Sequence, residues 1–189
     1  MRIISGRYRN KKIFFPKNLR TRPLKDSVRE NIFNILKHSK NIQVKIENSY
    51  IMDLYAGSGS FGIECLSRDA EKVYFVEKDK EAINNLKKNI RNLNLENKSE
   101  IFDEDILEFS RRIQLKKKID IIFLDPPYKN EEYINTIKVL RDKDVLNKKH
   151  IVIMHRERKT NFELNKKINI IENRIYGRSE IFFGILLWY

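Results

Sequence analysis

Strand-like and helix-like segments alternate from residue 50 to residue 155, and this alternation restricts the fold more than any other feature of the sequence. Apolar runs that predict strands cover five segments: 50–55, 72–77, 99–103, 119–124 and 150–155. Helical patterns lie among them, at 60–68, 79–92, 106–112 and 131–140. Such alternation is typical of an open, mostly parallel sheet with helices on both faces. We therefore predict an α/β fold built around one sheet.

The last part of the chain departs from this alternation. Only Gly177-Arg178-Ser179 separates the apolar runs 167–176 and 180–188, which predicts an antiparallel hairpin at one edge of the sheet. Five alternating units followed by a β-hairpin are typical of Rossmann-like methyltransferases, whereas dinucleotide-binding sheets more often end on parallel strands. We therefore expect a Rossmann-like sheet that ends in an antiparallel β-hairpin.

The first 45 residues are predicted to form a small β-hairpin and helix extension, and residues 46–189 the main domain. Segments 2–8 and 12–16 predict the hairpin, and a helix is expected to follow. Asp26 is the expected N-cap of that helix. Its apolar face would consist of Val28, Ile32, Ile35 and Leu36.

Positive charge is concentrated in the first forty residues. The chain carries a net charge of +13 at pH 7. Residues 1–40 contain twelve lysines and arginines but only two acids, whereas the rest of the chain is nearly balanced. A local excess of this kind indicates contact with a polyanion such as a nucleic acid. The residues expected to contact this polyanion are Arg2, Arg7, Arg9, Lys11, Lys12, Arg20, Arg22, Lys25 and Arg29.

Composition excludes several other classes of protein. With 189 residues, of which 41% are hydrophobic, the chain is long enough for one substantial core and too apolar for disorder. No apolar stretch approaches the length of a membrane span, and the N-terminus lacks a signal-peptide pattern, so we expect a cytoplasmic protein without membrane contact. The single cysteine, Cys65, excludes a disulfide framework and a Cys-based zinc site. We expect a monomer without a metal site.

A glycine loop follows the first predicted strand. Gly57, Gly59 and Gly62 form a G-x-G-x-x-G pattern that leads into the next helix. The pattern alone fits NAD, FAD or S-adenosylmethionine (SAM). Asp53, placed just before the loop, disfavours a pyrophosphate and favours the ammonium of a methionine moiety. Glu77 ends the second strand, where it is suited to accept hydrogen bonds from ribose hydroxyls of either kind of cofactor.

The third and fourth strands end in further candidate binding residues. Asp105 could accept a hydrogen bond from an adenine amino group, with Ile106 on the purine face. Asp125-Pro126-Pro127-Tyr128 follows the fourth strand and predicts a rigid corner. If the Asp125 carboxylate and the Pro126 carbonyl each accept one N–H of an exocyclic amine, its lone pair is aimed at a sulfonium methyl. Tyr128 would stack on the base, and positioning would supply most of the rate.

Five motifs spread over nearly the whole chain carry a resemblance to a known family. They are segments 2–6, 21–36, 53–59 and 125–128, together with Tyr176-Gly177. Together they resemble the bacterial 16S ribosomal RNA guanine-N2 methyltransferases of the RsmD type, which are class I SAM-dependent enzymes. The segment 21–36, which begins Thr-Arg-Pro, is the most specific part because generic methyltransferases lack it.

The resemblance implies SAM as the methyl donor and a guanine of ribosomal RNA as the acceptor, presented on a small ribosomal subunit or its assembly intermediate. It also implies that Thr21, Arg22 and Pro23 fold back over the cofactor cleft. The expected cofactor-binding residues are Asp53, Tyr55, Gly57, Ser58, Gly59, Phe61, Glu77, Lys78, Asp105, Ile106, Thr21, Arg22 and Pro23. The expected catalytic residues are Asp125, Pro126, Pro127 and Tyr128.

The chain departs from the family pattern in two places near the expected site. Ser60-Phe61 replaces small apolar residues after the glycine loop, which bears on the edge of the cofactor site. Met154-His155 ends the fifth strand where an acid is common in the family. We expect His155 to be structural rather than catalytic.

Three alternatives remain open from the sequence. The same corner would suit adenine N6 or cytosine N4 of DNA, although the Thr-Arg-Pro segment favours RNA. The glycine loop would also suit an NAD-dependent oxidoreductase, against which Asp53 argues. A non-catalytic RNA-binding protein that has kept the fold is the third alternative.

Overall fold

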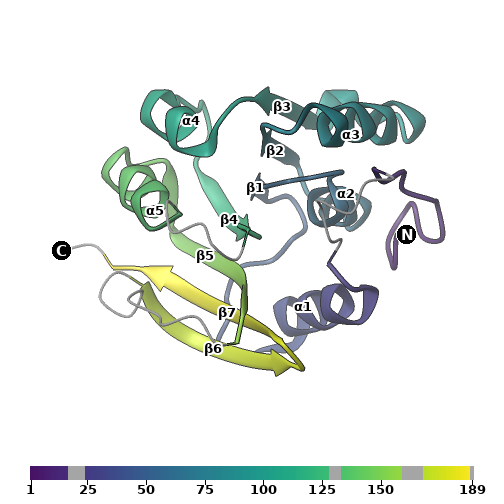
Figure 1. The fold of residues 1–189 in the computed structure, drawn as a ribbon. Coiled ribbons are helices and arrows are strands. Elements are labelled where there is room, and N and C mark those ends of the chain that lie inside the picture. The colour runs from purple at the N-terminus through teal and green to yellow at the C-terminus, as the bar shows by residue number, and fades with distance from the viewer. Residues whose placement is uncertain (17–23, 128–132, 159–167, 188–189) are drawn as a thin grey trace.

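The computed structural model describes residues 1–16, 24–127, 133–158 and 168–187, and it is built around one seven-stranded sheet (Figure 1). The strands lie in the order β3-β2-β1-β4-β5-β7-β6. The first five in this order run parallel, and β7 is antiparallel to both β5 and β6. This arrangement confirms the predicted Rossmann-like α/β fold with a terminal antiparallel hairpin.

The structure also gives the bounds of each element. The strands are β1 (Tyr50–Leu54), β2 (Lys72–Glu77), β3 (Ser99–Asp103), β4 (Ile119–Leu124), β5 (Leu146–Glu157), β6 (Ile168–Tyr176) and β7 (Ser179–Leu186). The helices are α1 (Asp26–His38), α2 (Ser60–Ser67), α3 (Lys80–Asn92), α4 (Ile106–Arg112) and α5 (Tyr133–Asp142), with a short 3-10 helix, η1 (Glu96–Lys98). Three strands, β2, β3 and β4, have the predicted bounds. The fifth begins four residues earlier than predicted because Leu146 pairs with Ile119, ahead of a register shift.

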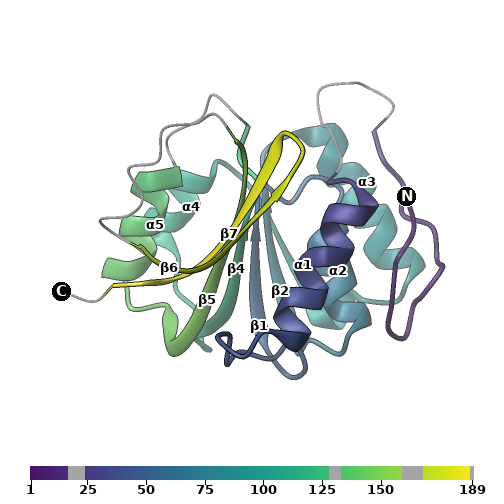
Figure 2. The same cartoon turned by 90° about the horizontal axis from the view of Figure 1, so that it is seen from below.

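Helices cover both faces of the sheet, as Figures 1 and 2 show: α1, α2 and α3 on one face, α4 and α5 on the other. Alternate strand residues supply the two hydrophobic cores, as expected for a pleated strand whose successive side chains point to opposite faces. Phe75 and Phe123 belong to one core, and their neighbours Val76 and Leu124 belong to the other. No helix in the described part of the chain is long and apolar enough to cross a membrane.

The N-terminal segment packs onto the first of these cores. Its predicted hairpin is reduced to one antiparallel bridge between Arg2 and Lys12, and Ile3 and Ile13 are buried. Both side chains lie in the hydrophobic cluster on the face of the sheet that α2 covers. The division into an N-terminal extension, residues 1–45, and a main domain, residues 46–189, remains a proposal. Because the two parts share this hydrophobic core, the division concerns their functions.

The start of α1 differs from the prediction. Asp26 is not the N-cap: it is the first helical residue, and Lys25 precedes it without a side-chain capping bond. The Asp26 carboxylate instead accepts a hydrogen bond from the Arg29 guanidinium, at 3.1 Å. An acid in the first turn still interacts favourably with the helix dipole. Of the predicted apolar face, Val28, Ile32 and Leu36 are buried and Ile35 is partly buried.

Candidate active site

The candidate site lies at the edge of the sheet formed by the carboxyl ends of the parallel strands. The register pairs Leu54 of β1 with Val76 of β2 and with Leu124 of β4. The residues that follow these positions therefore come to one edge, although they are distant in the sequence. In open α/β sheets, ligands bind in the crevice outside this edge.

The glycine loop turns the chain tightly from β1 into α2. Gly57 has φ +55° and Gly59 has φ +82°, a region that favours glycine. A Cβ on Gly59 would lie 2.4 Å from a Leu86 methyl, whereas one on Gly57 would meet nothing within 4 Å. Gly59 is therefore required for packing, and Gly57 leaves backbone exposed toward open space. Tyr55 also has a positive φ, 61°, which the sequence pattern did not reveal.

Asp53 lies beneath this loop. Its side chain is 1% exposed, and its Oδ2 accepts a hydrogen bond of 2.9 Å from the backbone N–H of Gly62. Burial raises the pKa of the Asp53 carboxyl well above its ordinary value, and the Gly62 hydrogen bond offsets only part of this effect. The observed role of Asp53 is to hold the first turn of α2. Contact with a ligand ammonium stays a prediction.

Glu77 joins the end of β2 to the glycine loop. Its Oε2 accepts from the N–H of Gly57 at 2.8 Å. Its Oε1 accepts from the N–H groups of Lys78 and Asp79, at 2.8 and 2.9 Å. The carboxylate is thereby oriented at the edge where a ribose was predicted to bind.

Asp105 and Lys78 form the next part of the edge. Asp105 caps α4 by accepting from Leu107 N–H at 2.9 Å, and its other oxygen lies 3.0 Å from Lys78 Nζ. Burial alone would raise the pKa of Asp105, but the hydrogen bonds from Lys78 and Leu107 outweigh it and lower the pKa. Ile106 is buried in the second core. The predicted contacts of Asp105 and Ile106 with adenine stay predictions.

Two of the residues that were predicted to bind the cofactor, Phe61 and Ser58, are buried. Phe61 is 1% exposed and stacks on Phe123, with ring centroids 4.1 Å apart. The prediction that Phe61 binds the cofactor is therefore wrong, because its ring fills the core under α2. Ser58 is buried as well, and its hydroxyl has no hydrogen-bond partner within the described ranges.

The predicted catalytic corner follows β4. Pro126 is buried and Pro127 exposed, and the Asp125 side chain is 25% exposed. The Oδ1 of Asp125 lies 2.7 Å from Nδ1 of His155, and Nη1 of Arg156 donates to the Pro127 carbonyl at 3.3 Å. Tyr128 lies outside the described residues, as do Arg20, Thr21, Arg22 and Pro23.

Sequence reasoning missed the approach of His155 to Asp125. The signal that could have revealed it is the parallel pairing of β4 with β5, which sets Leu124 beside Met154. The residues that follow this pair are Asp125 and His155. The expectation that His155 is structural did not include this contact.

Most of the predicted RNA-contacting residues are on the surface. The side chains of Arg2, Arg7, Arg9, Lys11, Lys12 and Lys25 are exposed. Arg7 also forms an ion pair of 3.1 Å with Asp69. The prediction for Arg29 is wrong: this side chain is 0% exposed and donates to the Arg2 carbonyl, so it anchors the N-terminal segment instead of reaching RNA.

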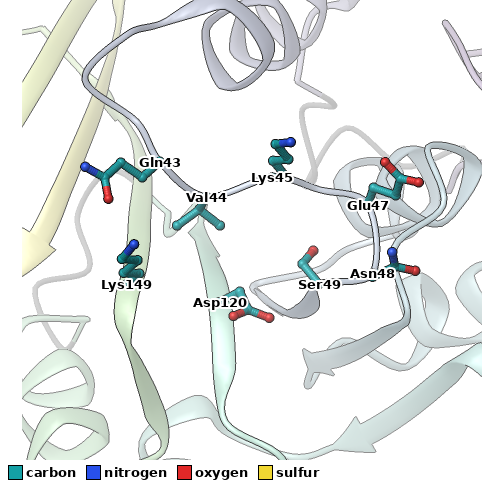
Figure 3. A pocket seen from close by; sticks show the side chains of 8 residues that line it. All are labelled: Gln43, Val44, Lys45, Glu47, Asn48, Ser49, Asp120 and Lys149. Carbon is teal, nitrogen blue, oxygen red and sulfur yellow. The ribbon is translucent and has the colours of Figure 1, made fainter.

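A concave feature lies at the opposite edge of the sheet. It is a pocket of about 290 Å³ at the start of β1 and β4, lined by Lys45, Ser49, Asp120 and Lys149 among others (Figure 3). Both Asp120 oxygens are engaged in the structure, with Tyr50 N–H at 2.8 Å and with the Asn147 amide at 2.6 Å. Asp120 therefore joins β1, β4 and β5 and is a structural residue.

Comparison with known proteins identifies the family. A family model described as Conserved hypothetical protein 95 matches residues 1–185. Ribosomal RNA small subunit methyltransferase D of Buchnera aphidicola subsp. Acyrthosiphon pisum is 32% identical over 183 residues, which cover 97% of this chain and 92% of that protein. Its namesake from Haemophilus influenzae is 39% identical over 129 residues, which cover 68% of this chain and 64% of that protein.

A solved structure agrees with these sequence matches. The putative methyltransferase yhhF from Escherichia coli has a TM-score of 0.82 to this chain at 26% identity, covering 97% of this chain and 96% of that one. The similarity of the two folds therefore covers almost the full length of both chains. The chain therefore belongs to the Conserved hypothetical protein 95 family, that of the RsmD-type methyltransferases.

Proposed function

We propose that this protein transfers a methyl group from SAM to the exocyclic N2 of a guanine in small-subunit ribosomal RNA. The observation that carries the proposal is the position of Asp125. Its carboxylate is held by His155 at the end of β4, on the same edge of the sheet as the Gly57–Gly59 loop. The names of the relatives support ribosomal RNA as the substrate.

The residues present fit SAM at the glycine loop. Gly57 leaves open space for close approach of a ligand, and the buried Ser58 hydroxyl has no partner among the described residues. The Glu77 carboxylate, held by the N–H of Gly57, would accept hydrogen bonds from ribose hydroxyls, and Asp105, beside Lys78, would accept one from the adenine amino group. When bound, SAM supplies an electrophilic methyl group on a sulfonium.

Asp125 and Pro126 would hold the amino group of the base. Oδ1 of Asp125 is engaged by His155, which leaves Oδ2 to accept one amino hydrogen. The Pro126 carbonyl would accept the other, so that the nitrogen lone pair points toward the methyl group. Asp125 and Pro126 would thereby hold the nitrogen in line with the methyl group that SAM would supply. The proton that the methylated nitrogen must release would pass to Oδ2 of Asp125 and from there to water. Orientation of this kind contributes up to about 7–11 kcal/mol to lowering a barrier.

The exposed basic residues of the N-terminal segment would bind the RNA backbone. Arg9, Lys11 and Lys12 are exposed and can contact phosphates without losing a buried interaction. Base-modifying enzymes take the target base out of its stack, and proteins read RNA mostly at unpaired bases. We propose that the substrate is a small ribosomal subunit or an assembly intermediate of it.

Methylation of small subunits that lack the modification tests this function. Purified protein, labelled SAM and such subunits should yield N2-methylguanine on nucleoside analysis. Label in N6-methyladenine or N4-methylcytosine of DNA would instead support the DNA alternative. Calorimetry that detects binding of NAD and none of SAM would support an oxidoreductase.

The Asp125→Ala variant tests the corner itself. Loss of one preorganised polar group from an active site typically lowers kcat by about 10²-fold or more. We expect that loss with SAM affinity unchanged. Asp120→Asn, at the other end of β4, is the matched control and should lower stability while keeping kcat. Unchanged turnover in Asp125→Ala would contradict the assigned role.

A further inference from the structure

We propose that His155 is a positioning residue that fixes the Asp125 carboxylate for catalysis. This inference rests on the proposed function, which assigns the amino group of the base to Asp125. Nδ1 of His155 lies 2.7 Å from Oδ1 of Asp125, and His155 as a residue is only 7% exposed. The pairing joins the ends of β4 and β5.

The chemistry of the pair determines which nitrogen carries the proton. An ionised carboxylate only accepts hydrogen bonds, so Nδ1 of His155 must be the donor. Nε2 is buried, and within the ranges that the structure describes it has no hydrogen-bond partner. A proton placed on Nε2 would be buried without an acceptor, which is unfavourable. The geometry therefore favours the His155 tautomer that carries its proton on Nδ1.

This arrangement favours positioning over proton transfer. To relay a proton, a histidine must receive it on one nitrogen and release it from the other. Nε2 of His155 meets no described group to which it could pass a proton. The histidine therefore holds Oδ1 in place, and Oδ2 remains for the base.

The sheet makes His155 a rigid support. The backbone of His155 pairs with Ile181 of β7. On the other side of β5, the preceding residue, Met154, pairs with Leu124 of β4. The residue that follows His155, Arg156, is 2% exposed and donates to the Pro127 carbonyl at 3.3 Å. Two successive residues of β5 thus hold the first and third residues of the catalytic corner. Groups supported by a rigid element keep the geometry that catalysis needs better than groups on a free loop.

Three variants separate positioning from folding. His155→Leu fills the site but removes the donor. His155→Asn places an amide N–H as many bonds from Cα as Nδ1 is, so it can restore the hydrogen bond. His150→Leu, in the same strand, removes bonds of a buried histidine to Asn147 and Leu186 that are remote from the site.

We expect kcat of His155→Leu to fall about 10- to 100-fold, the range expected when a supporting hydrogen-bond partner is lost, with the KM for SAM and for the RNA nearly unchanged. His155→Asn should recover most of kcat, and His150→Leu should lower the melting temperature while keeping kcat. Equal kcat in His155→Leu and the unaltered protein, or no recovery in His155→Asn, would overturn the proposal.

A spectroscopic measurement decides the pairing independently of activity. Imidazole ¹⁵N spectra at neutral pH should show a protonated Nδ1 and an unprotonated Nε2 for His155. The Nδ1 proton should lose its downfield shift in Asp125→Ala. A proton on Nε2 alone would refute the pairing. If the unaltered protein makes no N2-methylguanine but the spectra are as expected, the proposed function fails and the support of Asp125 by His155 stands.

Discussion

The backbone N–H of Gly57 donates a hydrogen bond of 2.8 Å to the carboxylate of Glu77. This contact joins the glycine loop after β1 to the end of β2, the neighbouring strand. Because the other Glu77 oxygen accepts from Lys78 and Asp79, one side chain sets the shape of two turns at the candidate cofactor site.

Glu77→Gln should weaken SAM binding. The glutamine retains one acceptor, but its amide NH₂ must face a backbone N–H on the other side. Hydrogen bonds to charged groups contribute about 1.5–3 kcal/mol, so we expect the Kd for SAM to rise about 10- to 100-fold. Isothermal titration calorimetry measures this change. Glu71→Gln, an exposed residue just before the same strand, is the control, and an equal Kd in both variants would contradict the role of Glu77.

Gly57→Ala should also weaken SAM binding, for a different reason. A Cβ at Gly57 would project into open space, so the methyl group would obstruct a ligand while clashing with no part of the protein. The positive φ adds a strain of about 1–2 kcal/mol.

Gly177→Ala controls for that strain. Gly177 has φ +61° in the hairpin between β6 and β7, and a Cβ there also meets nothing. The two variants should lose similar stability in urea unfolding, and only Gly57→Ala should bind SAM less tightly. Parallel losses of affinity would show that strain alone is responsible.

Asp53→Asn should change how stability depends on pH. Burial raises the folded-state pKa of Asp53 above its value in the unfolded chain, so the folded protein binds this proton more tightly. The resulting stabilisation is complete at pH below the unfolded pKa and is lost as pH rises through the folded pKa. An asparagine does not titrate, and its carbonyl can still accept from Gly62.

Urea unfolding at several pH values measures this effect. The free energy of unfolding of Asp53→Asn, minus that of the unaltered protein, should increase as the pH rises from about 4 toward neutrality. A difference that is constant over this range would show that Asp53 has the same pKa in the folded and unfolded states.

Replacement of Arg9, Lys11 and Lys12 by glutamine should weaken RNA binding and reduce its dependence on salt. Each phosphate contact to a single strand contributes about 0.7 to the slope of log K against log salt concentration. If all three contact phosphates, the slope should fall by about 2. Filter binding at several salt concentrations measures it.

Matched replacements on another face provide the control for charge. Lys116 and Lys117, just before β4, and Lys143, just after α5, are exposed. Their replacement by glutamine removes the same charge. The slope should change less in this variant. Equal changes in both would mean that RNA responds to the overall charge of the protein and that the N-terminal segment has no special role.

The sequence by itself determined the elements that depend on neighbours along the chain. The strands β2, β3 and β4 have the predicted bounds because their apolar runs and flanking polar residues are local features. The edge that collects the candidate site was also predictable, since parallel strands bring their carboxyl ends together. The glycine loop after β1, Glu77 at the end of β2 and Asp125 after β4 could be located at this edge by the same reasoning.

Only the tertiary structure decided which side chains are buried and which meet across strands. Arg29 is charged and was predicted to contact RNA, but packing of the N-terminal segment over α1 encloses its guanidinium. Phe61 follows the glycine loop, but its ring stacks in the core. His155 meets Asp125 because the pairing of β4 with β5 aligns residues thirty positions apart. Sequence periodicity reports which face of an element is apolar, whereas the identity of the partner depends on strand order and register, which arise from the packing of the whole chain.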